Sequence, residues 1–144
     1  SETWEDLFFR LLLARIEPQL GRAHPTFLTH WPAAQAALAR RDPADPRVAE
    51  RFELFVCGIE LANAFVELTD AAEQRARFVA DRARRHALAH AGSDTPPDHD
   101  WPLDEDFLAA LAHGMPASAG IALGFDRLAM IAAGADRIDQ VLWL

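Results

Sequence analysis

Two glutamates, Glu53 and Glu60, lie seven residues apart on either side of Gly58. A chain that folds back on itself at the glycine brings both carboxylates to one site. Two carboxylates together with phosphate oxygens suit Mg²⁺, which demands octahedral oxygen coordination and usually shares its shell with a nucleotide. The spacing is therefore compatible with a nucleotide-linked magnesium site. The alternative is that both glutamates lie on exposed strand faces, where carboxylates are usually found.

A second polar group follows directly in the sequence, where Asn63, Phe65 and Glu67 alternate with apolar residues. Alternation with a period of two places all three side chains on one face of a strand. A carboxylate and an amide oxygen can bind an ammonium group, while the aromatic ring packs against an aliphatic stem. This pattern is compatible with a site for an amine ligand, and ordinary half-buried strand patterning, which is common, is the alternative.

The third group is in the segment GIALGFDR, which contains Gly120, Ala122, Gly124 and Arg127. Arg127 lies at the amino end of an expected helix, where the helix dipole disfavours a cation. Its guanidinium would be stabilised there by a bound phosphate, which matches the arginine fork. The two glycines have no Cβ and let a flat ring approach the strand. The alternative is a strand packed on a helix, with Arg127 paired to Asp126 or another surface acid.

The elements that must position these groups are read from periodicity and capping signals. The helices expected from apolar spacing, N-capping residues and closing glycines or prolines cover residues 3–17, 71–91, 105–113 and 126–133. Strands are expected within 24–32, at 51–57 and 59–68 with a hinge near Gly58, and at 118–124. The long second helix should end at Gly92.

The order of these elements does not alternate as βαβ units would. It predicts an α+β fold, with an antiparallel sheet flanked by helices. Such a sheet can leave one face open for a ligand. The 144 residues correspond to a single domain.

Composition narrows the class of protein further. The net charge is −8, and this acidic balance argues against a sequence-independent grip on nucleic acid. The single cysteine excludes an internal disulfide. The sequence shows neither a long apolar span nor a signal peptide, so the expected location is the cytoplasm and no membrane partner is expected.

Taken together, two segments resemble the catalytic domain of class II aminoacyl-tRNA synthetases of the lysyl type. RFELFVCGIELANAFVELTDAAEQRARF, at 51–78, resembles the amino-acid and metal segment of that family, and GIALGFDRLAMI, at 120–131, resembles its third signature motif. PTFLTHWPA, at 25–33, is placed as in that family. The resemblance implies that residues 1–144 are the carboxyl-terminal portion of one catalytic domain, whose first and second motifs are absent from this chain.

The resemblance also implies a role for each candidate residue. Glu53 and Glu60 would bind Mg²⁺ linked to ATP, and Arg127 would be the catalytic contact to the terminal phosphate. The remaining roles are lining of the lysine pocket, by Asn63, Phe65, Glu67 and Ala122, and placement beside the adenine, by Gly120 and Gly124. The implied reaction forms an aminoacyl-adenylate and then transfers the aminoacyl group.

Within the family, the details of three segments are similar to a subgroup that modifies a lysine of elongation factor P instead of tRNA. These are HWPAAQAALA at 30–39, GIELANAF at 58–65, and Ala122 at a position where tRNA enzymes usually carry glycine. The extra methyl is associated with β-lysine in place of α-lysine. A homodimer is expected for the whole protein. The alternatives are a fragment of a lysyl-tRNA synthetase and a non-catalytic paralogue that binds lysine and nucleotide.

Overall fold

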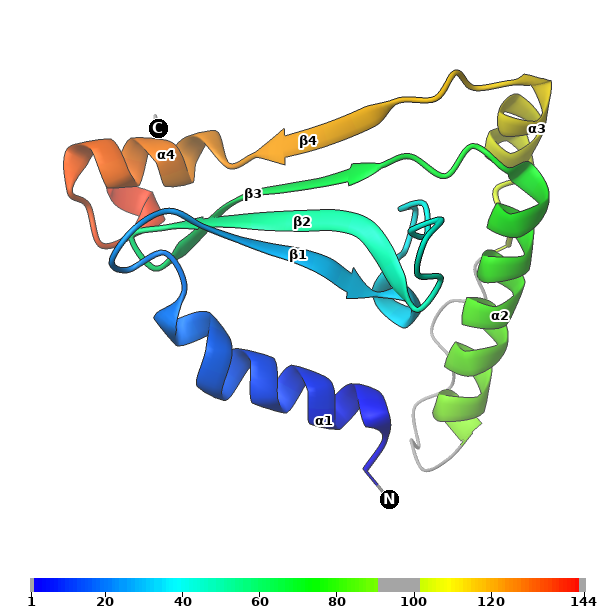
Figure 1. Ribbon diagram of the computed structural model, residues 1–144, viewed down its shortest axis with the longest axis horizontal. Coiled ribbons are helices and arrows are strands. Elements are labelled where there is room, and N and C mark those ends of the chain that lie inside the picture. The colour runs from blue at the N-terminus through cyan, green and yellow to red at the C-terminus, as the bar shows by residue number, and fades with distance from the viewer. Residues whose placement is uncertain (1, 91–101, 143–144) are drawn as a thin grey trace.

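The structure is a computed structural model that describes residues 2–90 and 102–142. Its centre is a four-stranded antiparallel sheet with the strand order β1-β2-β3-β4 (Figure 1). The strands are β1 (Thr26–Pro32), β2 (Val48–Val56), β3 (Ile59–Val66) and β4 (Ala119–Leu123). The helices that accompany this sheet confirm the expected α+β class. The order of the strands in the sheet is the same as their order along the chain.

Helices flank the sheet at both ends of its strands (Figure 1). The α-helices are α1 (Trp4–Leu11), α2 (Ala71–His90), α3 (Glu105–His113) and α4 (Phe125–Ala133). Short helices of other types are η1 (Leu12–Ile16), η2 (Glu17–Gln19), η3 (Ala33–Gln35) and η4 (Ile138–Gln140). In the described part of the chain, no helix combines the length and the apolar character needed to cross a membrane.

Several boundaries differ from the sequence-based expectation. The first helix is α-helical only to Leu11 and continues as a π-helical turn at Leu12–Ile16 before the proline. β2 begins three residues earlier than expected, and β3 ends at Val66, so Glu67 lies just beyond the strand. Glu67 still forms an isolated antiparallel bridge with Ala39. The expected helix end at Gly92 lies outside the described residues.

A two-residue turn joins β2 to β3. Cys57 and Gly58 both have positive φ angles, 54° and 79°, as a type I′ hairpin turn requires. Val56 and Ile59 pair directly on either side of it. The expected reversal at Gly58 is therefore confirmed, and the turn fixes the register in which the two glutamate-bearing strands begin to pair.

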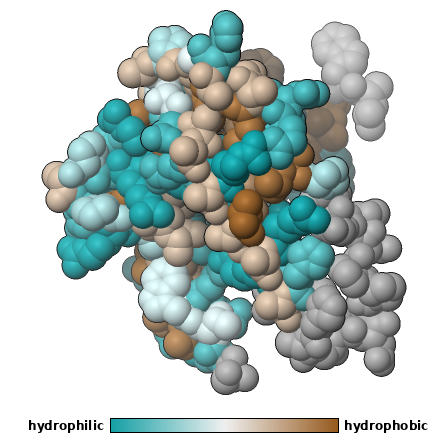
Figure 2. All heavy atoms as spheres, turned by 90° about the vertical axis from the view of Figure 1, so that its right-hand side faces the viewer, coloured by the Kyte–Doolittle hydropathy of each residue, from teal (hydrophilic) through white to brown (hydrophobic). Residues whose placement is uncertain are grey.

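The core is small and rich in alanine. Ala36, Ala39 and Ala49 form a buried cluster, and the half-buried ring of Phe65 packs against it. At the end of the sheet opposite α4, α2 and α3 lie side by side, with a contact between the rings of Phe78 and Phe107. Figure 2 shows that side of the molecule, where hydrophilic and apolar side chains are mixed.

Candidate active site

One row of residues crosses all four strands at the centre of the candidate site. Leu28 pairs with Glu53, Glu53 with Asn63, and Asn63 with Ala122. Directly opposite residues in antiparallel strands project from the same face of the sheet. The strand pairing therefore brings Glu53, Asn63 and Ala122 together, although they come from three different strands.

A β-bulge in β3 adds Glu60 to that face. Phe55 pairs with Glu60, but Leu54 pairs with Ala62, so Leu61 is the extra residue on β3. Strict alternation would send Glu60 and Asn63, three residues apart, to opposite faces. The bulge cancels that offset, because one extra residue shifts the register by one. Both expected carboxylates consequently lie on the face that carries Asn63.

Glu53 is the most deeply placed carboxylate of the site. Its side chain is only 10% exposed, and its Oε1 accepts hydrogen bonds from Arg51 Nη2 at 2.6 Å and Asn63 Nδ2 at 3.2 Å. Burial raises the pKa of Glu53, and the negative charge of Glu60 raises it further, while Arg51 acts in the opposite direction. A bound cation would offset both the burial of Glu53 and the negative charge of Glu60, so these surroundings favour cation binding at the Glu53 carboxylate.

Arg127 reaches the same group of side chains from the first turn of α4. Its Nη1 donates to the backbone oxygen of Glu60 at 2.6 Å and lies 3.4 Å from Glu60 Oε2. The backbone N–H of Gly124 donates to Leu61 O at 2.9 Å, which fixes the start of the helix against β3. In this structure Arg127 pairs with an acid, as the alternative interpretation expected, and that acid is Glu60, not Asp126.

The space beside each glycine of the third motif holds a protein side chain. A Cβ on Gly120 would lie 2.9 Å from Glu67 Oε1, so the absence of a side chain there makes room for that carboxylate. A Cβ on Gly124 would lie 3.1 Å from Arg127 Cδ. Gly120 pairs with Phe65, which places Glu67, Phe65 and Gly120 next to one another.

Arg51 is a member of the site that the sequence analysis did not single out. It lies two residues before Glu53 on the same face of β2, and its side chain is 18% exposed. Its guanidinium contacts both Glu53 and Asn63. The available signal was a charged residue two positions before Glu53, and therefore on the same face of the expected strand, between Glu50 and Phe52.

The donor set fits a magnesium ion that shares its coordination shell with a substrate. Glu53 and Glu60 supply two carboxylates. Among the described residues, no group of three or more His, Cys, Asp or Glu side chains is placed to hold a metal ion alone. Mg²⁺ commonly binds through one or two carboxylates together with waters and substrate phosphates, so two carboxylates suffice.

Comparison with known proteins identifies the family. Residues 12–144 match the class II tRNA synthetases (D, K and N). The chain is 49% identical over 143 residues to a protein from Edwardsiella ictaluri named elongation factor P–(R)-β-lysine ligase, covering 99% of this chain and 42% of the relative. A protein of the same name from Vibrio cholerae is 49% identical over 137 residues, 94% of this chain and 40% of the relative.

A third relative of that name, from Pectobacterium carotovorum, is 51% identical over 127 residues, covering 88% of this chain and 37% of the relative. The chain thus spans about two fifths of the length of these relatives. The family match covers nearly all of the chain, and it includes every residue of the sheet face described above. The chain belongs to the class II tRNA synthetase family that comprises the D, K and N enzymes.

Proposed function

We propose that the protein containing this chain is an ATP-dependent ligase that activates lysine or β-lysine and transfers it to a lysine amine of elongation factor P. The observation that carries the proposal is the convergence of Glu53, Glu60, Asn63 and Arg127 on one face of the sheet. The names of the relatives support the amino acid and the acceptor.

In this proposal the residues divide into two groups. Glu53 and Glu60 hold Mg²⁺ and Arg127 holds the terminal phosphate of ATP, with Gly120 and Gly124 beside the adenine. Bound Mg²⁺ supplies charge neutralisation at the phosphate oxygens. Arg127 would exchange its contact with Glu60 Oε2 for the phosphate, which would leave the Glu60 carboxylate free to hold Mg²⁺. Positioning and electrostatic stabilisation account for the chemistry, since no side chain needs to act as a nucleophile.

The second group lines the amino-acid pocket. Glu67 provides the charge that binds an ammonium group, Phe65 packs against the aliphatic stem, and Asn63 lies between Glu53 and Ala122 in the central row. The Ala122 methyl narrows the pocket at the position opposite Asn63. This placement supports a role for Ala122 in selecting between β-lysine and α-lysine.

Further parts of the proposal concern the whole protein. Residues 1–144 are the carboxyl-terminal portion of a larger catalytic domain, in keeping with the share of each relative that the chain spans. We also propose a homodimer, on the resemblance to the family, and a cytoplasmic location, as the sequence led us to expect. Size-exclusion chromatography with light scattering on the complete protein tests the homodimer, and a monomer would contradict it.

The reaction is tested with the complete protein. Lysine-dependent and β-lysine-dependent exchange of pyrophosphate into ATP measures activation, and transfer of radiolabelled amino acid is then measured to elongation factor P and to tRNA in parallel. We expect exchange with both lysine isomers, with β-lysine preferred over α-lysine. We expect the radiolabel to appear only on elongation factor P. Label only on tRNA would instead identify a lysyl-tRNA synthetase, and ligand binding without exchange would identify a non-catalytic paralogue.

A further inference from the structure

Arg51, whose side chain is largely buried, contacts residues of its own strand β2 and of three other elements, β1, β3 and η3. Its Nη2 donates to Glu53 Oε1 at 2.6 Å, its Nε donates to Asn63 Oδ1 at 3.3 Å, and its Nη1 donates to the backbone oxygen of Gln35 at 3.0 Å. Its guanidinium carbon also lies 4.4 Å from the ring centroid of Trp31, whose side chain is buried. These contacts hold the guanidinium plane in one orientation.

The same contacts determine the orientation of Asn63. Asn63 accepts from Arg51 through Oδ1 and donates to Glu53 through Nδ2, so the three side chains form a closed triangle. A reversed amide would face its N–H groups toward the guanidinium and its oxygen toward the carboxylate, losing both hydrogen bonds. Arg51 therefore dictates which group Asn63 presents on each side.

Arg51 also leaves one oxygen of Glu53 available. Both hydrogen bonds to that carboxylate end on Oε1, and within residues 2–90 and 102–142 no hydrogen bond reaches Oε2. An arginine can hold one oxygen while its planar fork engages a second acceptor, which a lysine ammonium at the same place would do less well. Among the described residues, Glu53 Oε2 and the second N–H of Asn63 therefore have no hydrogen-bond partner.

We propose that Arg51 is a positioning residue that orients Asn63 and Glu53 for the amino acid and the metal ion. This inference rests on the proposed function, because it assumes that Asn63 lines the lysine pocket. Arg51 acts through these two side chains and does not itself touch the substrate. It belongs to the ligand-binding machinery in the way that hydrogen-bonded partners of metal ligands do.

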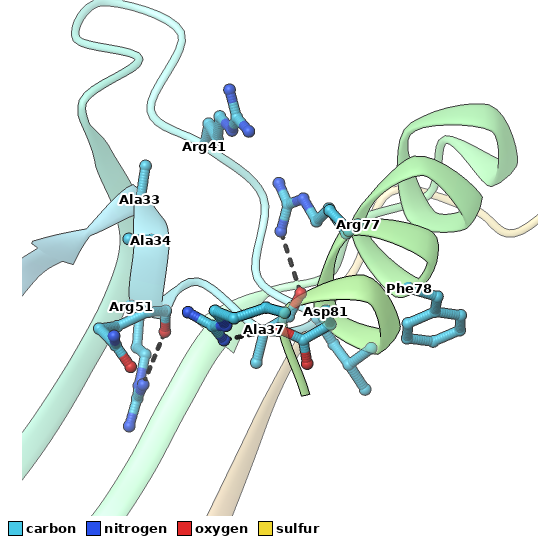
Figure 3. A pocket seen from close by; sticks show the side chains of 12 residues that line it. Ala33, Ala34, Ala37, Arg41, Arg51, Arg77, Phe78 and Asp81 are labelled. Carbon is cyan, nitrogen blue, oxygen red and sulfur yellow. Dashed lines mark hydrogen bonds and ion pairs between the residues drawn. The ribbon is translucent and has the colours of Figure 1, made fainter. Parts of the chain in front are cut away.

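The contact with Gln35 extends this arrangement to the loop after β1. Arg51 and Gln35 both line a cavity of about 520 Å³ between that loop and α2. Figure 3 shows Arg51 on one side of the cavity and Arg77, Phe78 and Asp81 of α2 on the other. Arg77 donates to the backbone oxygens of Ala37 and Ala39, so the loop that Arg51 holds is also fixed from α2.

The test compares Arg51→Gln and Arg51→Lys in the complete protein, with Arg47→Gln as a control. Arg47 is an exposed arginine whose side chain pairs only with Asp45, two residues away, among the described residues. Calorimetric titration with L-lysine and with β-lysine, without ATP or Mg²⁺, measures binding directly. We expect Arg51→Gln to weaken binding by about 10-fold or more, the effect typical of removing a residue that orients a ligand-binding group. Arg51→Lys should recover part of the affinity, and Arg47→Gln should bind like the parent.

A second readout does not depend on the ligand. Asn63 is the single asparagine of this chain, and in the ¹⁵N-asparagine-labelled complete protein its side-chain amide signal is assigned by its loss in Asn63→Ser. We expect the signal to shift in both Arg51 variants and to stay unchanged in Arg47→Gln. Parent-like lysine affinity in folded Arg51→Gln, or an unshifted Asn63 signal, would overturn the proposal.

The remaining outcomes are also decisive. If Arg51→Gln does not fold, the Arg51→Lys variant alone decides. Parent-like lysine affinity together with an unshifted Asn63 amide signal in Arg51→Lys would overturn the inference. Weaker lysine binding together with a shifted signal would support it. If the parent binds neither lysine isomer, the proposed function fails. The Asn63 signal in the Arg51 variants then still shows whether Arg51 orients that side chain.

Discussion

Replacing Gly120 with alanine should displace one carboxylate of the proposed lysine pocket and leave the fold intact. The added Cβ would lie 2.9 Å from Glu67 Oε1, whereas ordinary van der Waals contact begins at 3.4 Å. The carboxylate must therefore retreat by about 0.5 Å, which a flexible side chain can do at little cost in stability. Because alanine also suits a strand better than glycine, we expect the free energy of unfolding to change by less than about 1 kcal/mol.

Binding of lysine should respond far more strongly than stability. A displacement near 1 Å at a binding group can cost about 100-fold, so a shift of half that size should lower the affinity for lysine about 10-fold. We would measure this by calorimetry and by the KM for lysine in pyrophosphate exchange, both with the complete protein. Ala119→Ser is the matched control, because it adds one heavy atom to the neighbouring residue on the opposite face of β4.

A double-mutant cycle tests whether the effect passes through Glu67. If Gly120→Ala acts by displacing that carboxylate, it should cost nothing further in a Glu67→Ala background, and the coupling energy should be about 1.4 kcal/mol. Two outcomes refute the reasoning. One is unchanged lysine affinity in Gly120→Ala, and the other is full additivity of the two substitutions.

Four further substitutions test other parts of the structure in the complete protein. Cys57→Asn should raise the free energy of unfolding by about 0.5–1 kcal/mol, because asparagine tolerates the positive φ of the type I′ turn, and a lower urea midpoint would contradict this. Gly21→Ala should lower the free energy of unfolding by about 2 kcal/mol or more, because the φ angle of Gly21 is 69° and the new Cβ would lie 2.5 Å from the backbone carbonyl carbon of Phe55. An unchanged urea midpoint would refute that contact. The pKa of Glu53 in the folded protein is raised above its ordinary 4.5, so the stability that Glu53 contributes is full below pH 4.5 and is lost as the pH rises through the raised pKa. Glu53→Gln should therefore become more stable relative to the parent as the pH rises over this interval. A difference in urea midpoint that does not depend on pH would contradict this prediction. Ala122→Gly should shift the ratio of kcat/KM values toward α-lysine by about 10-fold, as one methyl group can contribute, and an unchanged isomer preference would argue against its role in the pocket.

The sequence by itself determined the elements and most of the residues of the site. Periodicity and capping residues placed the strands and helices within a few residues, because these signals are local: apolar spacing sets an amphipathic face, and a glycine sets a reversal. The helix at Glu105–His113 was predicted with its observed bounds. The motif resemblance also identified the family, which the match over residues 12–144 confirms.

Only the tertiary structure decided how those residues meet. The bulge at Leu61 puts Glu60 on the face of Asn63, and alternation along one strand cannot reveal it, because a bulge is defined by the pairing of two strands. The role of Arg51 depends likewise on Asn63, twelve residues away in the chain and adjacent only across the strand pair. Single-strand patterns give the face of each residue relative to its neighbours, whereas cross-strand register decides which carboxylates, amides and cations share a site.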